Sequence, residues 1–212
     1  SRGEGGWADP EDYKSIAEDL AAIEARFRDD EGRPVNPLGR TGIAGRGLLG
    51  LWGPNAAVAA LVVRRESASG GLELVLGGVD GSSDLGLPQG FVLPGEEPSS
   101  AAARVLANET GVTVGDAETW LVSEGFTYDR RQTDHAWVEG KAYLLLLDPE
   151  VGLPAFDPGG EFDEIRWWPL TADVVNRVPG RQVEFIRSAI QDLAERGQVE
   201  SSEAEEMLSR TG

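Results

Sequence analysis

The stretch from residue 87 to residue 112 constrains the fold of this chain most, because a loop punctuated by glycine and proline runs there directly into a short helix-forming segment. The stretch contains two glycines, two carboxylates, a guanidinium and an apolar residue, namely Gly90, Gly111, Glu96, Glu109, Arg104 and Val112. The loop and the helix after it are the stretch around which the rest of the chain is organised.

A helix is predicted over residues 100–110, because Ser99 or Ser100 can cap its start and Gly111 can end it. Positions 105, 108 and 109 share one face of such a helix, since residues three and four apart are neighbours. In this sequence that face carries an isopropyl group, an amide and one carboxylate.

The spacing from Gly90 to Val112 resembles the box that defines the Nudix hydrolases. In that family the box glutamates hold divalent metals, which activate water against a diphosphate. Here Val105 replaces the first of these glutamates and Asn108 the second. The resemblance implies Mg²⁺ or Mn²⁺ held weakly, or as a single ion, by Glu96, Glu97 and Glu109. We therefore expect the diphosphate to be bound better than it is cut.

Charge and composition exclude several other classes of function. The formal net charge of -18 argues against nucleic-acid and anionic-membrane partners. The chain has no cysteine, and no apolar run approaches the roughly 18 residues that span a bilayer. We expect a cytoplasmic protein without membrane insertion. Because the chain starts with Ser1 and its only methionine is Met207, we also expect a piece of a longer protein, with an upstream effector domain in the case of a ligand sensor.

The chain is predicted to have three parts. Residues 1–33 form a linker and a helix, residues 34–197 the main domain, and residues 198–212 an acidic tail with one marginal helix. Apolar residues recur at helical spacing from Tyr13 to Phe27, after Asp9 as the cap and Pro10 at the first position. This amphipathic helix is expected to pack on the domain; binding of a partner is the alternative.

A segment rich in glycine, proline and arginine spans residues 29–55, and its apolar residues argue against disorder. Its motifs run from Asn36 to Gly42, from Gly45 to Leu49 and from Trp52 to Asn55. They resemble the Nudix branch of the mitochondrial ADP-ribose pyrophosphatase and of the ADP-ribose-sensing domain of melastatin-type TRP channels. The resemblance implies ADP-ribose, or a related nucleoside diphosphate, as the ligand. The ligand-binding residues expected from these motifs and from the box are Arg40, Arg46, Asn55, Gln89 and Gly90.

The stretch from Asp129 to Glu139 resembles a second motif of the same branch, in which an aspartate and an arginine contact the ribose and phosphate end of ADP-ribose. Carried over, these residues are Asp129 and Arg131. A carboxylate accepts from vicinal hydroxyls and a guanidinium donates to phosphate in a fork, so the roles are chemically sensible. An exposed, charged hairpin loop is the alternative. His135, the only histidine, is expected to be a hydrogen-bonding loop residue.

An acidic loop over residues 148–162 precedes the last predicted strand. In many Nudix domains such a loop supplies the general base, and the candidates here are Glu161, Asp163 and Glu164. A solvated charged loop is the plainer interpretation of the same residues.

The resemblance covers residues 34–195 and implies an α/β fold, the Nudix α/β/α sandwich with a mixed sheet, preceded by an N-terminal helical element. Strands are predicted at residues 56–65, 72–76, 120–128, 137–147 and 163–170, with a loop over 77–87 and a closing helix over 180–196. Two functions remain open. One is a ligand-sensing module with an impaired box, and the other a Mg²⁺-dependent pyrophosphatase giving AMP and ribose 5-phosphate. As an enzyme, the chain would use Glu96, Glu109 and one loop carboxylate, Glu161 or Glu164, as catalytic residues.

Overall fold

The computed structural model describes residues 27–79, 83–113, 118–148 and 162–209. The chain divides into two compact units, the first comprising Ser1–Ala56 and Gly125–Gly140 and the second Ala57–Glu124 and Lys141–Gly212. The predicted helix of residues 9–27 lies almost wholly outside the described residues. Within the described part, no helix is long and apolar enough to cross a membrane.

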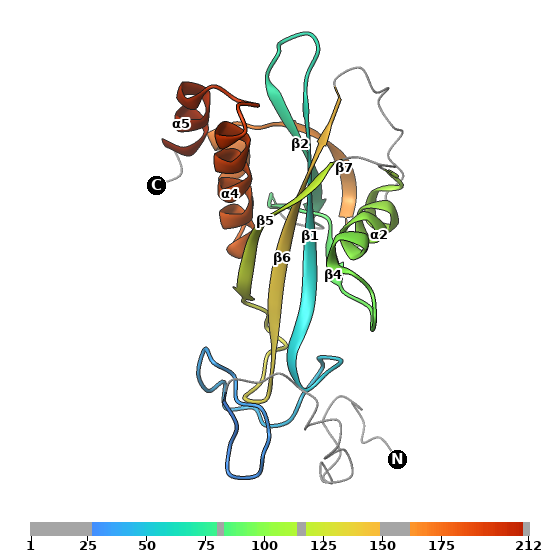
Figure 1. Ribbon diagram of the computed structural model, residues 1–212, viewed down its shortest axis with the longest axis vertical. Helices are drawn as coiled ribbons and strands as arrows, with labels where there is room; N and C mark the ends of the chain where they lie inside the picture. Colours follow the sequence, from blue (N-terminus) through green and yellow to red (C-terminus); the bar gives the residue numbers. More distant parts are fainter. Residues whose placement is uncertain (1–26, 80–82, 114–117, 149–161, 210–212) are drawn as a thin grey trace. The chain divides into compact units, whose positions relative to one another are not determined.

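A seven-stranded sheet with the path β3-β2-β1-β6-β5 carries the fold, with β4 paired to β1 and β7 to β2 (Figure 1). Its strands are β1 (Gly53–Arg65), β2 (Leu72–Val79), β3 (Leu85–Gly86), β4 (Gln89–Phe91), β5 (Thr119–Thr127), β6 (Ala136–Leu147) and β7 (Phe162–Pro169). The helices are α2 (Pro98–Thr110), α3 (Ala172–Val175), α4 (Arg181–Glu195) and α5 (Ser201–Ser209). Strands β1 and β2 form the predicted antiparallel hairpin, with Val63 opposite Leu74.

Strand β1 separates the two hydrophobic cores of the second unit, because successive side chains of a strand point to opposite faces. Even-numbered residues from Val58 to Val62 pack in a cluster with α2. Odd-numbered residues from Ala59 to Val63 pack in a cluster with α4 and α5. The second unit is therefore a sheet with helices on both faces, which confirms the predicted α/β class and layering.

The helix of the glycine-rich stretch begins two residues earlier than predicted. Its N-cap is Glu97, which makes no side-chain capping bond, and Pro98 occupies the first turn. Proline is favoured there because its missing N–H has no partner inside the helix. Ser99 and Ser100 therefore lie within α2. The predicted end is confirmed, since Gly111 adopts the left-handed conformation with φ +70°.

Two further expectations were wrong. Residues 77–87, predicted as a loop, contain the end of β2 and the short strand β3. The helix over residues 180–196 was expected to close the fold, but the helix expected in the acidic tail, α5, follows it, and Ala204 and Met207 of α5 are buried in the core shared with α4. A short apolar stripe among acidic residues was enough to dock this helix. The helix α3 is only four residues long and was too short to show a helical period.

Candidate functional site

The box loop is held on α2 by a forked ion pair within the second unit. Nε of Arg104 donates to Oε1 of Glu96 at 2.7 Å, and Nη2 donates to Oε2 at 2.8 Å. The backbone N–H of Leu93 donates to the same carboxylate at 2.9 Å. The bonds from Arg104, followed by that from Leu93, lower the pKa of Glu96 to about 2. Glu96, predicted as a metal ligand, is thus engaged in fixing the loop.

Val105 fills the position where the family box has its first glutamate. Its side chain is only 3% exposed and belongs to the core beneath α2. It lies directly on Gly90, because a Cβ at Gly90 would come within 2.9 Å of Cγ2 of Val105. Gly90 itself is fixed in β4 opposite Val58 of β1. The box helix therefore presents hydrocarbon to β4 at this point.

Few of the remaining box positions carry a carboxylate that could bind a metal ion. Asn108 is exposed, Glu109 is half-buried, and Glu97 is exposed at the start of α2. Among the described residues, no group of three or more His, Cys, Asp or Glu side chains could hold a metal ion. The donor set, with Glu96 bound to Arg104, Val105 buried and an amide at 108, does not fit a cluster of several metals.

The acidic residues predicted as general bases are not brought to the box by any described contact. Glu164 is exposed on β7, and its Oε1 lies 3.4 Å from Nε of Arg166. Glu161 and the side chain of Asp163 lie outside the described residues. Their catalytic role stays a prediction.

In the first unit, Asp129 and Arg131 bind each other. Nε of Arg131 donates to Oδ1 of Asp129 at 2.9 Å, and Nη2 donates to Oδ2 at 2.5 Å. The guanidinium is the main cause that lowers the pKa of Asp129. The side chain of Arg131 remains 39% exposed. The pair is thus a preformed unit whose guanidinium can still be approached.

Asp134 holds the glycine-rich segment in place, a role that the sequence did not reveal. Its Oδ1 accepts from the N–H of Thr41 at 2.6 Å, from the hydroxyl of Thr41 at 3.0 Å and from the N–H of Gly42 at 2.9 Å. Burial opposes its charge, but these donors leave the pKa below its usual value. The partners lie 92 and 93 residues away in sequence, so no local pattern could indicate them.

The predicted ligand residues of that segment differ in what they contact. The side chain of Arg40 is 86% exposed, with Nε 3.3 Å from Oδ2 of Asp134. Arg46 donates to the carbonyl of Gly50 at 2.8 Å. The side chain of Asn55 is buried, and its amide bonds to backbone groups of Leu51, Gly53 and Trp137, which indicates a loop-holding role. Gln89, in β4, is exposed.

His135 agrees with its expected loop role. Its ring is buried in the first unit, with Nδ1 3.0 Å from the carbonyl oxygen of Pro34. The indole of Trp52 lies beside it, with ring centroids 5.9 Å apart.

Comparison with known proteins decides the family. The sequence profile of the NUDIX domain matches residues 47–189, well over half of the chain. The chain belongs to the Nudix family. The profile of the NUDT9-like N-terminal domain matches residues 9–53. This Nudix protein is 37% identical over 184 residues to a putative nudix hydrolase 6 of Caenorhabditis elegans, covering 76% of this chain and 70% of the relative.

Two further relatives support the predicted branch. The mitochondrial ADP-ribose pyrophosphatase of Rattus norvegicus is 30% identical over 202 residues, covering 76% of this chain and 58% of the rat enzyme. The transient receptor potential cation channel subfamily M member 2 of Mus musculus is 37% identical over an alignment of 129 residues, covering 54% of this chain and 8% of the channel. The Nudix chain thus spans little more than half of the rat enzyme and a small part of the channel.

Solved structures show the same fold. The NUDIX domain of Shewanella oneidensis NrtR, crystallised with ADP ribose, superposes with a TM-score of 0.53 at 19% identity, covering 84% of this chain and 97% of that one. A MutT/nudix family protein from Enterococcus faecalis gives a TM-score of 0.55 at 17% identity, covering 73% and 67%.

Proposed function

We propose that this Nudix domain binds ADP-ribose or a closely related nucleoside diphosphate and hydrolyses it poorly, as a ligand-sensing module. The observation that carries the proposal is the burial of Val105 against Gly90, which puts hydrocarbon where the family places a carboxylate. The branch supports the ligand, because relatives include an ADP-ribose pyrophosphatase, and a structural neighbour was crystallised with ADP ribose.

The expected loss of hydrolysis is large. Nudix hydrolases generally use divalent ions such as Mg²⁺, and here two box carboxylates are replaced by Val105 and Asn108. Removing one group that stabilises a transition state typically slows a reaction about 10²- to 10³-fold. Glu109 is the box carboxylate left on α2 to hold a weakly bound ion, because Glu96 is bound to Arg104 and Glu97 lies at the opposite end of the helix.

Binding need not suffer from the same replacements. Arg131 is held in a fork by Asp129 yet remains partly exposed, and Arg40 is largely exposed, so both can offer charge-assisted hydrogen bonds to phosphate oxygens. In this proposal the two arginines supply local positive charge in a chain whose net charge is -18. A sensing role further implies an effector that responds to the bound ligand.

Hydrolysis of ADP-ribose to AMP and ribose 5-phosphate is the second candidate. Its support is the retained Glu109 on α2, together with a 30% identical relative that is an ADP-ribose pyrophosphatase. In that case Glu161 and Glu164, the latter on β7, are the candidates for the general base.

One experiment separates the two functions. ADP-ribose is titrated calorimetrically with and without Mg²⁺, and the same samples are assayed for AMP by chromatography. We expect binding with intact ligand, whereas steady accumulation of AMP supports the enzyme.

The Val105→Glu, Asn108→Glu double variant then tests the damaged box. It is expected to raise the rate of AMP release about tenfold or more, while a Val105→Gln, Asn108→Gln control of the same size is not. Near-UV circular dichroism and ADP-ribose binding establish that both variants fold. Unchanged hydrolysis in a folded, ligand-binding glutamate variant would count against the proposal.

A further inference from the structure

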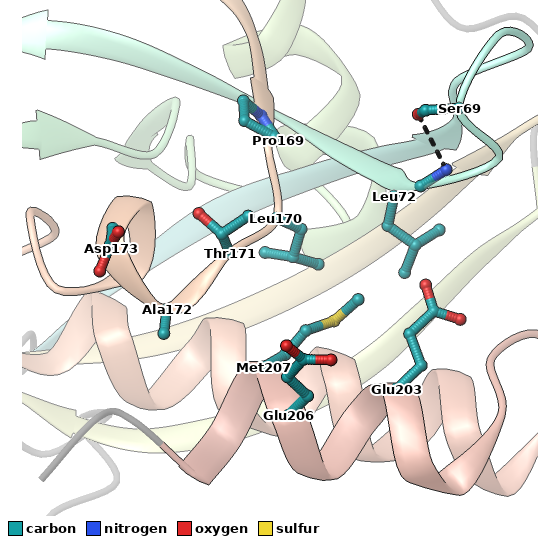
Figure 2. A pocket seen from close by; sticks show the side chains of 11 residues that line it. Ser69, Leu72, Pro169, Leu170, Thr171, Ala172, Asp173, Glu203, Glu206 and Met207 are labelled. Carbon is teal, nitrogen blue, oxygen red and sulfur yellow. Dashed lines mark hydrogen bonds between the residues drawn. The ribbon is translucent and has the colours of Figure 1, made fainter.

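A cavity of about 470 Å³ lies on the second unit beside α5, over an apolar floor that includes Leu72 and Met207 (Figure 2). Two of the three carboxylates in its lining have partners within the protein. Oε1 of Glu203 lies 3.8 Å from Nη1 of Arg65, and Glu206 also has a partner. The charge of this cavity therefore does not point to a cationic ligand.

The loop that presents Arg131 in the first unit is a hydrogen-bonded turn over residues 129–132. The N–H of Gln132 donates to the carbonyl of Asp129 at 3.0 Å, which closes the turn. Aspartate suits the first position of a turn, because its carboxylate can accept from the backbone two residues further on. That bond is present, from the N–H of Arg131 to Oδ1 of Asp129 at 2.8 Å. The turn therefore brings the carboxylate of Asp129 and the guanidinium of Arg131 together.

The side chain of Gln132 attaches this turn to the end of β5. Nε2 of Gln132 donates to the carbonyl of Thr127, the last residue of β5, at 3.0 Å. Tyr128, which follows Thr127, is 83% exposed, so its side chain adds little packing that could hold the turn. Gln132 is only 7% exposed. A hydrogen bond at this depth is strengthened by the low local dielectric.

The amide of Gln132 uses its donor and leaves its acceptor unused. Among the described residues, Oε1 of Gln132 is buried and has no hydrogen-bond partner. The opposite orientation of the amide would point Oε1 at the carbonyl of Thr127, and two acceptors repel each other. An unpaired buried oxygen costs free energy. The bond donated to Thr127 is therefore what distinguishes glutamine here from an apolar side chain of similar length.

The chain directly after Gln132 is fixed on two sides. The N–H of Thr133 donates to the carbonyl of Ala136, the first residue of β6, at 2.8 Å. The carbonyl of Thr133 accepts from Nδ2 of Asn36 at 3.0 Å. Gln132 therefore holds the turn from a fixed base.

We propose that Gln132 is a positioning residue for the guanidinium of Arg131, an inference that rests on the proposed function, in which Arg131 meets the diphosphate. The bond from Gln132 to Thr127 and the bond that closes the turn span the same short loop, so each makes the other harder to break. Arg131 is thereby kept in the fork of Asp129 while its side chain stays partly exposed. A guanidinium that is already ordered loses less freedom when it binds phosphate, which favours affinity.

Gln132→Met tests the bond to Thr127, because methionine keeps the length of the side chain and lacks the donor. His135→Leu is the matched control, since it removes another buried donor of the same unit, Nδ1 to the carbonyl of Pro34 at 3.0 Å. The exchange of the Nε–H of Arg131 with water is measured by ¹⁵N NMR without ligand, and the resonance is assigned with Arg131→Lys.

We expect this exchange to be about tenfold faster in Gln132→Met and within about twofold of the wild-type rate in His135→Leu. Gln132→Asn, whose amide is one methylene shorter, is expected to change the rate in the same direction and replaces the methionine variant if that variant does not fold. An unchanged rate in the folded variant of Gln132, or an equal rise in His135→Leu, would overturn the proposal.

The affinity for ADP-ribose separates positioning of Arg131 from a purely structural role. Calorimetry on wild type, Gln132→Met, Arg131→Ala and the double variant gives a double-mutant cycle. Gln132→Met is expected to weaken binding about tenfold in the wild-type background, and by less than about twofold once Arg131 is replaced. An undiminished effect in the Arg131→Ala background would refute the positioning role. If the wild-type protein binds no ADP-ribose, the proposed function fails, and the exchange rate of the Arg131 Nε–H still decides whether Gln132 holds the turn.

Discussion

Replacing Gly90 by alanine tests the contact on which the proposed function depends. The new Cβ would lie 2.9 Å from Cγ2 of Val105. Carbon atoms attract best at about 3.5 to 4.0 Å, and Val105 is buried, so the core must shift. Overpacking of this kind costs about 1 to 3 kcal/mol.

The partner substitution Val105→Ala removes two buried methyl groups, which costs about 2 kcal/mol from transfer and cavity terms together. It also removes the clash, because Cβ of residue 105 is an ordinary 3.9 Å from the Cβ position of residue 90. The double variant should therefore be little less stable than Val105→Ala alone. The sum of the destabilisations of the two single variants would therefore exceed the destabilisation of the double variant by about 1 to 3 kcal/mol.

Urea unfolding of the wild type, both single variants and the double variant measures this coupling. Gly78→Ala is a matched control on β2, since its Cβ would meet nothing closer than 3.8 Å. Additive effects at positions 90 and 105 would refute the contact, and with it the inference that the box helix presents hydrocarbon to β4.

Three other outcomes are expected. Asp134→Asn should destabilise the fold by about 2 to 3 kcal/mol and speed proteolysis of the glycine-rich segment; an unchanged cleavage rate would show that the carboxylate does not hold it. Gly47→Ala should cost about 2 kcal/mol or more, because φ is +59° and the new Cβ would lie 2.8 Å from Cγ2 of Thr133. Adding Thr133→Ser, which deletes that methyl group, should recover part of the loss in urea unfolding. Glu96→Gln should lower the stability of the fold at neutral pH. Pairing with Arg104 depresses the pKa of Glu96 from 4.5 to about 2. The stability that the charged Glu96 contributes is therefore present above pH 4.5 and is lost as the pH falls towards 2. The gap between Glu96→Gln and wild type in urea midpoints should therefore close over that range, and a gap independent of pH would contradict this.

Much of the second unit was predictable because its elements have local signatures. A continuous apolar run marked β1, helical spacing marked α4, and Gly111 marked the end of α2. Elements without such signatures were missed, among them the two-residue strand β3 and the four-residue α3. A few apolar residues in an acidic tail were too weak a pattern to predict that α5 docks on the core.

The candidate site shows the same division. The box spacing and the replacements at positions 105 and 108 are visible in the sequence. The ion pair between Asp129 and Arg131 was not predicted, because both residues were expected to contact the ligand. The hydrogen bonds that individual side chains make in the fold are not visible in the sequence. The sequence shows an asparagine at 55 and an aspartate at 134, but only the fold engages them with backbone groups of other segments.

By itself, the sequence determined the family, the layered α/β class and the loss of two box carboxylates, because residue types, spacings and periods are local properties of the chain. The tertiary structure alone decided that Val105 packs on Gly90, that Asp134 anchors a segment more than ninety residues away, and that an acidic cavity with an apolar floor forms beside α5. These features depend on which distant segments meet, and that is settled by packing of the whole core rather than by any pattern along the chain.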